Sequence, residues 1–478
     1  MEWRLLRWRR VPHAGGMTST TSNKRPVSSP PAAPPARAAR AQPAPPTPII
    51  SRVLADGTQI ETLYDAASST TKLAICAPSG KIAIAGHFDL PGGERLVPYS
   101  AANNLLASDC VLLPSEVGDF GDKVGLLAAV RDYIHRYVDL SAHFEEIAAH
   151  YVLLSWVHDA FNELPYLRFR GEYGTGKTRA LLAVGSICYK PIFASGASSV
   201  SPIFRLLDAF GGTLILDEAD LRFSDATADL TKILNNGNMQ GLPVLRTMTN
   251  RHKELHPQAY KVYGPKIIGM REGFADEALE SRFLTEETGG RPLRGDISVH
   301  LPVIMKEEAR TLRNRLLAWR FAARNSVGVD PGRAIAGLSP RGNQTVLALL
   351  SLVDDEKLRQ RIADDLVGQE ARAAAKRAAS PRVTMVAVLH AMFAHALTPY
   401  LTLTDVAAAY NAAIAERGEQ PLAVKAVGWL VRSQLDLVTM KTRGVYVIPQ
   451  TEREKVDALA VRHGLSLDDP DPSSGLAA

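Results

Sequence analysis

The chain has 478 residues, of which 46% are hydrophobic and 22% are charged, and its formal net charge is +5. This length and composition predict about two to four domains with real cores, and the positive charge fits a nucleic-acid partner without requiring one. Cys76, Cys110 and Cys188 are too far apart for a CxxC-type zinc site, so we expect free thiols in a reducing cytoplasm. No later window is apolar enough for a membrane span, which predicts a soluble, cytoplasmic protein with no membrane partner for the folded part of the chain.

Residues 1–48 are rich in Pro, Ala, Ser and Arg, which predicts a disordered arm. Its first ten residues are basic and amphipathic, so a membrane or nucleic-acid contact there stays open. Residues 49–115 alternate between apolar and polar positions and are interrupted by Pro-Ser-Gly and Pro-Gly-Gly, which predicts a small β-rich module. We recognise no catalytic pattern in that module.

Residues 116–163 have helical periodicity and predict a connector of two helices, over 124–140 and 142–161. Ser141 is the expected N-cap of the second helix. The histidines of this helix, at 143, 150 and 158, lack a carboxylate partner at metal-ligand spacing, so we do not expect them to bind a metal.

Residues 171–178 read Gly-Glu-Tyr-Gly-Thr-Gly-Lys-Thr, which is the phosphate-binding pattern G-x-x-x-x-G-K-[ST]. Residues 166–170 predict a short strand that leads into it, and the residues from 178 onward predict a helix, as a P-loop requires. Its glycines allow backbone amides to approach phosphate oxygens, and the helix directs its positive end toward the anion. The pattern predicts ATP and Mg²⁺ as cofactors, with these residues binding the nucleotide: Gly171, Gly174, Thr175, Gly176, Lys177 and Thr178.

A second acidic element begins at residue 212, where a short apolar run ends in Asp217 and Glu218. We expect Asp217 to lie at the carboxyl end of a strand and to bind Mg²⁺ with Thr178. Glu218 is then the base that polarises the attacking water. An exposed acidic helix start is the alternative.

Two apolar runs, over 243–249 and 259–263, predict a β-hairpin whose tip carries Arg251 and Lys253. We expect this basic tip to contact nucleic acid, with an ordinary solvated turn as the alternative. A core strand is predicted at 265–270, and a short helix at 276–283 that contains Arg282.

Taken in order, the P-loop, the Asp-Glu strand, the hairpin, the core strand and the run Ala-Leu-Glu-Ser-Arg-Phe at 278–283 resemble the AAA+ ATPases. Within them the chain is most similar to the hairpin-bearing helicases, which include the minichromosome-maintenance helicases and the superfamily 3 helicases of viruses and mobile elements. The resemblance implies an α/β fold, with an AAA+ core and central parallel sheet over residues 164–290.

The same resemblance implies ATP hydrolysis by a homo-oligomer, a hexameric ring, in which Arg282 is an arginine finger directed at the neighbour's γ-phosphate. An ordinary helix-terminal arginine is the alternative. The family's polar sensor is not matched, because Met270 is followed by Arg271 and Glu272, and Arg271 is only a weak candidate for that role.

Residues 291–380 are strongly periodic and predict a helical lid. Arg341, at the start of one lid helix, looks like the family's second sensor and would bind the γ-phosphate. A capped basic helix start is the alternative.

Residues 381–450 predict three helices and a hairpin and resemble a winged helix, and residues 451–478 predict a flexible tail. A winged helix would place Lys425 and Arg432 in a DNA groove and Lys441 and Arg443 on phosphates. Docking to another protein is the alternative.

These features together predict an ATP-driven DNA helicase or translocase linked to DNA replication. Two alternatives stay open: a DNA-binding loader or scaffold, such as a replication or transposition accessory ATPase, that does not unwind, and a transcription regulator controlled by ATP.

Overall fold

The computed structural model describes residues 45–196, 198–217, 225–249, 255–274, 276–290, 292–415 and 417–465. Most of the predicted N-terminal arm and the second half of the predicted tail lie outside these ranges. Within them, no helix combines the length and apolar character that crossing a lipid bilayer requires.

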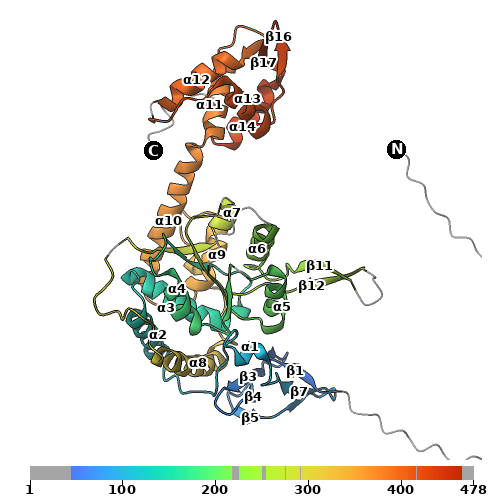
Figure 1. Cartoon of the computed structure of the whole chain (residues 1–478), viewed down its shortest axis with the longest axis vertical. Helices are drawn as coiled ribbons and strands as arrows, with labels where there is room; N and C mark the ends of the chain where they lie inside the picture. Colours follow the sequence, from blue (N-terminus) through green and yellow to red (C-terminus); the bar gives the residue numbers. More distant parts are fainter. Residues whose placement is uncertain are drawn as a thin grey trace, which may run out of the picture. The chain divides into compact units, whose positions relative to one another are not determined.

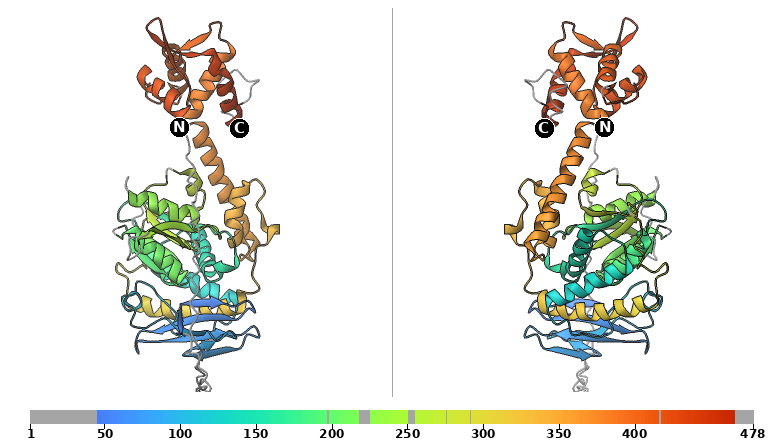
Figure 2. Two further views of the ribbon diagram at one scale, coloured as in Figure 1. Left: turned by 90° about the vertical axis from the view of Figure 1, so that its right-hand side faces the viewer. Right: turned by 90° about the vertical axis from the view of Figure 1, so that its left-hand side faces the viewer.

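Short strands form two small sheets over residues 47–98, where the alternating pattern predicts them. The first is the antiparallel meander of β2 (Ser51–Val53), β3 (Gln59–Asp65), β4 (Thr70–Cys76) and β5 (Ile82–Ala85). In the second, β7 (Arg95–Pro98) lies between β1 (Thr47–Ile49) and β6 (Phe88–Asp89). Ile60, Leu73, Ile75 and Leu96 are buried between these strands. Figure 2 shows the strands against the helix α8 (Ile304–Ala323).

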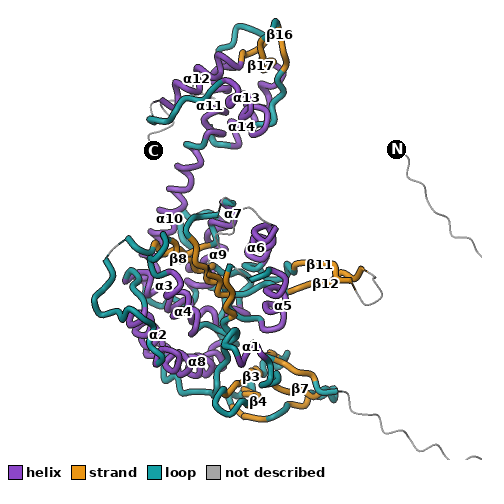
Figure 3. The backbone as a smooth tube through the Cα atoms, in the orientation of Figure 1, coloured by secondary structure: helices purple, strands orange, loops and turns teal. Residues whose placement is uncertain are grey.

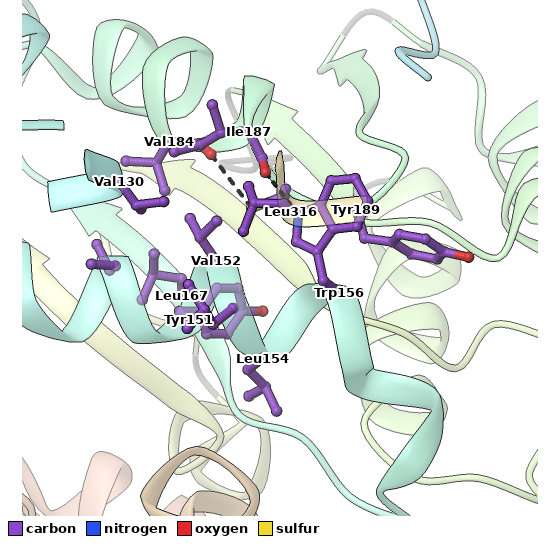
Figure 4. Close-up of a cluster of buried hydrophobic side chains, with 14 of the residues drawn as sticks. Val130, Tyr151, Val152, Leu154, Trp156, Leu167, Val184, Ile187, Tyr189 and Leu316 are labelled. Carbon is purple, nitrogen blue, oxygen red and sulfur yellow. Dashed lines mark hydrogen bonds between the residues drawn. The ribbon is translucent and has the colours of Figure 1, made fainter. Parts of the chain in front are cut away.

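Three helices follow: α1 (Asn104–Ala107), α2 (Lys123–Tyr137) and α3 (Ala142–Val157). The predicted cap is confirmed, because the Ser141 hydroxyl accepts the Phe144 amide at 3.2 Å. The predicted helix 142–161 is too long, since the chain tightens into the 3-10 turn η1 (His158–Ala160) and directs Asp159 toward Arg320. Figure 4 shows α3 at the centre of the main core, where the Trp156 indole donates to the Ile187 carbonyl at 2.9 Å.

The central sheet is parallel throughout, which confirms an α/β fold. Its strands are β8 (Tyr166–Arg170), β9 (Ile192–Ser195), β10 (Leu214–Asp217), β13 (Lys266–Met270) and β14 (Phe283–Glu287). Their order is β14-β8-β13-β10-β9. The helices between them are α4 (Lys177–Ser186), α5 (Val200–Phe210), α6 (Asp225–Asn236) and α7 (Glu277–Glu280) (Figure 1).

The predicted hairpin is present as β11 (Val244–Thr249) and β12 (Leu255–Tyr260), which form a two-stranded sheet of their own (Figure 3). Its second strand begins four residues earlier than predicted. This strand contains Pro257, which pairs with Thr247. Proline is tolerated because each strand of a two-stranded sheet is an edge strand and need not donate on its outer side. The tip, residues 250–254, lies outside the described ranges.

The next helices are α8, α9 (Pro340–Leu350) and α10 (Glu356–Ala378), with the turn η2 (Pro331–Arg333) between the first two. α8 packs on α2, α3 and α4, and α9 packs on α3. Leu316 of α8, Leu349 of α9 and Leu358 of α10 belong to the same hydrophobic core as α3 and α4. The predicted domain boundary at residue 291 therefore does not separate two cores.

The C-terminal elements have a core of their own. They are α11 (Pro381–Ala394), β15 (Tyr400–Thr402), α12 (Leu403–Ala415), α13 (Val424–Trp429), η3 (Leu430–Gln434), β16 (Met440–Thr442), β17 (Val445–Pro449), η4 (Gln450–Glu452) and α14 (Arg453–Arg462). The three predicted helices and the hairpin are present. The strand β15, which pairs with β17, was not predicted from the sequence.

A buried ionic network joins β3 to α8 and to the end of α4. The Glu61 carboxylate, 2% exposed, accepts the Arg320 Nε at 2.9 Å and lies 3.2 Å from the Lys190 ammonium. The Tyr189 hydroxyl also donates to Glu61 at 2.6 Å, and Arg320 makes two further bonds to Asp159 at 2.8 and 2.9 Å. Burial lowers the pKa of Lys190 to about 8, against the opposing effect of Glu61. Glu61 is thus the carboxylate that compensates Lys190, and it shares the compensation of Arg320 with Asp159.

We expect Glu61→Ala to lower the free energy of unfolding by about 3–5 kcal/mol, because it leaves the buried Lys190 ammonium without a carboxylate, while Arg320 keeps Asp159. Glu94→Ala is the matched control, since Glu94 forms only an exposed pair with Arg52 at 3.4 Å and should cost less than about 1 kcal/mol. Urea denaturation of both variants measures the two values. Equal losses would show that the network does not support the fold.

Candidate nucleotide-binding site

The loop between β8 and α4 has the backbone geometry of a phosphate cradle. Gly174 and Gly176 have φ angles of 79° and 91°, in the region that side chains disfavour, and Gly176 precedes the first residue of α4. At Gly171 an added Cβ would overlap the hydroxyl and carbonyl oxygens of Thr288. All three glycines are therefore required by the shape of the loop.

Lys177 and Thr178 begin α4, so they lie at the positive end of the helix dipole. The Lys177 ammonium donates to the carbonyls of Gly171 and Glu172 at 2.7 and 2.6 Å. These two hydrogen bonds fix the Lys177 ammonium against the start of the P-loop. A phosphate entering the loop would meet this ammonium and the amides of the first helical turn.

Asp217 is the last residue of β10, and its carboxylate accepts the Thr178 hydroxyl at 2.7 Å. An added Cβ at Gly269, on the neighbouring strand β13, would lie 3.1 Å from the Asp217 carboxylate and 2.8 Å from Leu181. Glycine at 269 therefore leaves room for Asp217 beside α4. The predicted pair Thr178 and Asp217 is brought together, whereas Glu218 lies outside the described residues.

A cavity of about 310 Å³ opens beside this pair, between α4 and β9. Thr178 and Asp217 form its polar part, and Leu181, Phe193 and Ile215 form part of its apolar wall. Hydroxyl and carboxylate oxygens are ligands that Mg²⁺ accepts while it keeps several waters. The donor set at the head of the cavity fits that ion.

β14 supports the P-loop from its other side, which the sequence analysis missed. The Thr288 hydroxyl lies 2.8 Å from that of Thr175 and donates to the Arg170 carbonyl at 3.0 Å. Arg170 also binds Glu287 at 2.8 Å, and this hydrogen bond raises the pKa of the arginine. No local pattern indicates this contact, because it depends on β14 pairing with β8.

Arg282 lies at the opposite edge of the sheet. It precedes β14, and its carbonyl accepts the Tyr166 amide at the start of β8, at 2.8 Å. The P-loop follows the other end of β8, and a strand of five residues spans about 16 Å. Arg282 therefore cannot reach a phosphate that is bound by its own P-loop.

The Arg282 side chain is held by a short polar chain. Its Nη1 donates to the Asn235 amide oxygen, and the Asn235 amide nitrogen donates to Asp276 at 3.2 Å. Burial lowers the pKa of Arg282, and the Nε has no hydrogen-bond partner among the described residues. One donor of the guanidinium is thus fixed, while the buried Nε donates to no described residue.

A buried ion pair fixes α7 just before Arg282. Arg168, in the middle of β8, donates two bonds to Glu280 at 2.6 and 2.5 Å. Burial alone would raise the pKa of Glu280, but the Arg168 guanidinium holds it below its usual value. A signal for this pair exists in the sequence, because an arginine in the middle of an apolar strand requires a buried partner.

Arg341, the second residue of α9, lies near Arg282 and not near the P-loop. Its guanidinium donates to the Ala278 carbonyl at 2.8 Å, and Gln344, one turn later, donates to Glu163 at 2.7 Å. Glu163 precedes β8, so this end of α9 lies at the Arg282 edge of the sheet. Arg341 therefore lies at the edge of the sheet opposite its own P-loop.

The predicted nucleic-acid residues fall into two groups. Arg251 and Lys253 lie outside the described ranges. The other four, all exposed, lie on the C-terminal elements α13, η3 and β16 and in the turn after β16: Lys425, Arg432, Lys441 and Arg443. The helical and hairpin cations therefore belong to neighbouring elements (Figure 1).

No protein-family model matches the chain, and no curated protein matches it. Among solved structures, the C-terminal region of NrS-1 aligns with 82% of this chain and 96% of its own, with 12% identity and a TM-score of 0.34. The SCCmec type IV Cch active helicase aligns over 86% and 95%, with 13% identity and a TM-score of 0.31. The full-length MCM homolog from Methanopyrus kandleri aligns over 63% and 68%, with 12% identity and a TM-score of 0.32. These TM-scores are low, and the likenesses by themselves establish neither a shared fold nor a shared function.

Proposed function

We propose that the chain is an ATP-hydrolysing AAA+ motor that acts on nucleic acid, a ring-forming DNA helicase or translocase. One observation supports this proposal most directly. The P-loop lies next to the acidic end of β10, where the Thr178 hydroxyl is 2.7 Å from the Asp217 carboxylate. A lysine, a hydroxyl and a carboxylate in this arrangement are what nucleoside triphosphate hydrolysis by a P-loop protein requires.

Each residue of the site has one role in this proposal. Lys177 exchanges its two carbonyl partners for oxygens of the β- and γ-phosphates. Thr178 and Asp217 hold Mg²⁺, which when bound neutralises negative charge on those phosphates. Glu218, next in the chain, accepts a proton from the water that attacks the γ-phosphorus, and ADP leaves.

Arg282 acts on the γ-phosphate that is bound by the next subunit. Its distance from its own P-loop supports this assignment. Arg341 adds a second positive charge to the same surface, while Asn235 and the Arg168–Glu280 pair position Arg282. Each active site then needs two subunits, which favours a closed homo-oligomer, a hexameric ring in the family that the chain resembles.

Two surfaces act on DNA in this proposal. The β11–β12 hairpin presents Arg251 and Lys253 to the phosphate backbone inside the ring. Residues 381–450 act as a winged helix, with α11, α12 and α13 as its helices and β15, β16 and β17 as its sheet.

We expect Lys177→Ala to reduce ATP turnover by at least about 100-fold, because the charge that opposes the developing phosphate charge is lost. Lys306→Ala is the control, since Lys306 is an exposed lysine paired with Asp109 at 2.9 Å and should turn over ATP like the wild type. Phosphate release measures both variants. Wild-type turnover by Lys177→Ala would remove the P-loop from the mechanism.

Mixing two inactive variants tests whether Arg282 acts across a subunit interface. We expect Arg282→Ala to bind ATP without hydrolysing it, and an equal mixture with Lys177→Ala to recover about a quarter of wild-type turnover. That fraction of interfaces pairs an intact P-loop with an intact arginine. Lys177→Ala mixed with Asp217→Ala is the control, because both defects lie in one site and no interface is complete. A mixture without recovered turnover would contradict the assignment.

Turnover at increasing protein concentration, with and without single-stranded DNA, tests the motor itself. We expect turnover per subunit to rise with concentration, since the site is shared, and to rise again with DNA. ATP-dependent strand displacement separates a helicase from a loader or scaffold. Turnover per subunit that changes with neither protein concentration nor DNA would contradict the ring motor, although it would still be consistent with a P-loop ATPase.

A further inference from the structure

The C-terminal elements present two large aromatic side chains to solvent on one face. Trp429, at the end of α13, and Tyr446, on β17, are each 54% exposed. Val438, Met440 and Val445 nearby are also exposed, whereas Val427, Leu430 and Val431 are buried. The chain therefore has enough apolar residues to fill this core and still leaves its aromatic rings outside it.

Arg432 connects the two elements that carry these rings. Its guanidinium lies over the Tyr446 ring, 5.9 Å from the centroid, and its Nη1 is 3.4 Å from the Thr439 hydroxyl. A Cβ on Gly428 would lie 3.1 and 3.2 Å from the guanidinium nitrogens, so glycine lets Arg432 cross α13 at this point. Trp429 lies three residues before Arg432, a spacing that brings side chains to one side of a helix, so we group the arginine, the tryptophan and the tyrosine as one surface, which we call the aromatic face.

Positive charge surrounds the aromatic face. Lys425 lies one helical turn before Trp429, and Lys441 and Arg443 lie in the β16–β17 hairpin beside Tyr446. Two nearby carboxylates are engaged elsewhere: Asp436 is paired with Lys455 at 2.8 Å, and Glu452 accepts the Val438 amide at 3.1 Å. An anionic partner with flat apolar groups fits this combination.

The shape of η3 extends the helix into this face. Residues Leu430–Gln434 form a π-helical turn, a geometry that is rare and is found frequently at functional sites. In this turn Arg432, Ser433 and Gln434 are all exposed. These polar side chains therefore lie next to Trp429 in the sequence and are open to a ligand.

We propose that the aromatic face binds an unpaired strand of nucleic acid, with bases stacked on Trp429 and Tyr446 and phosphates held by Arg432, Lys425, Lys441 and Arg443. This inference rests on the nucleic-acid role in the proposed function. It departs from groove reading by a winged helix, because a duplex hides the faces of its bases and only unpaired bases offer a surface for stacking.

The test uses the full chain and two labelled probes: a thymidine oligonucleotide, and a duplex of the same length. Arg251→Ala and Lys253→Ala are included in every protein, so that the hairpin tip does not hide a loss at the aromatic face. We expect Trp429→Ala and Tyr446→Ala each to weaken single-strand binding by about 10- to 100-fold, with a much smaller effect on the duplex. Trp429→Phe should recover affinity to within about threefold, because a phenyl ring still stacks.

Val461→Ala, at an exposed apolar position on α14 away from the hairpin, is the matched control and should bind like its parent. Lys441→Ala should flatten the salt dependence of single-strand binding, whereas Trp429→Ala should leave that slope unchanged. Equal losses for duplex and single strand would overturn the inference, and so would unchanged single-strand binding. A change in self-association, in place of oligonucleotide binding, would assign the face to a second copy of the chain and also overturn it.

ATP turnover by the wild-type chain, with Arg251 and Lys253 intact, is measured separately and distinguishes the two proposals. Turnover that is absent in the wild type overturns the motor, while the effect of Trp429→Ala on the thymidine probe still decides the aromatic face. Turnover that is present, with single-strand binding unchanged in Trp429→Ala, overturns only the aromatic face.

Discussion

The candidate site depends on the register of three parallel strands. β13 pairs with both β8 and β10, so that Met270 lies opposite Arg170 and Ile268 lies opposite Leu216. Backbone hydrogen bonds therefore end these strands at one edge, where the P-loop follows β8 and Asp217 completes β10. The close packing needs glycine at 269, because a side chain there would displace the carboxylate. The chemistry at this edge is thus a consequence of sheet pairing.

The same sheet separates the two kinds of charged group. The Lys177 ammonium lies at the carboxyl edge, and Arg282, Arg341 and their polar neighbours lie at the amino edge. A rigid parallel sheet keeps these groups apart, so one subunit cannot complete the proposed site alone. The Arg168–Glu280 pair makes this separation stable, since it fixes the end of α7 to the middle of the sheet. In the proposal, the arginine that completes each nucleotide site comes from a neighbouring subunit.

Buried ions tie the N-terminal strands to this core. Glu61 belongs to a strand whose pattern gives no sign of its role, and its partner Arg320 is 259 residues away. Such a pair is costly to desolvate, and removing one member leaves the other uncompensated. The network therefore favours one arrangement of β3 against α8 over others. The Glu61 network could not be predicted from the sequence. The pair of Arg168 with Glu280 differs in this respect, because an arginine in the middle of the buried strand β8 indicates that a partner must lie nearby.

Local chemistry by itself determined the P-loop, the helix that follows it, the Ser141 cap and the strand that ends in Asp217, because each depends on neighbours within a few residues. The tertiary structure decided the rest. The second hairpin strand includes Pro257, which the sequence pattern did not predict. Arg341 lies near Arg282, and α8 shares one hydrophobic core with the sheet. These outcomes depend on which distant strands and helices pair, and the free energy of that pairing comes from burial and hydrogen bonds that no local pattern contains.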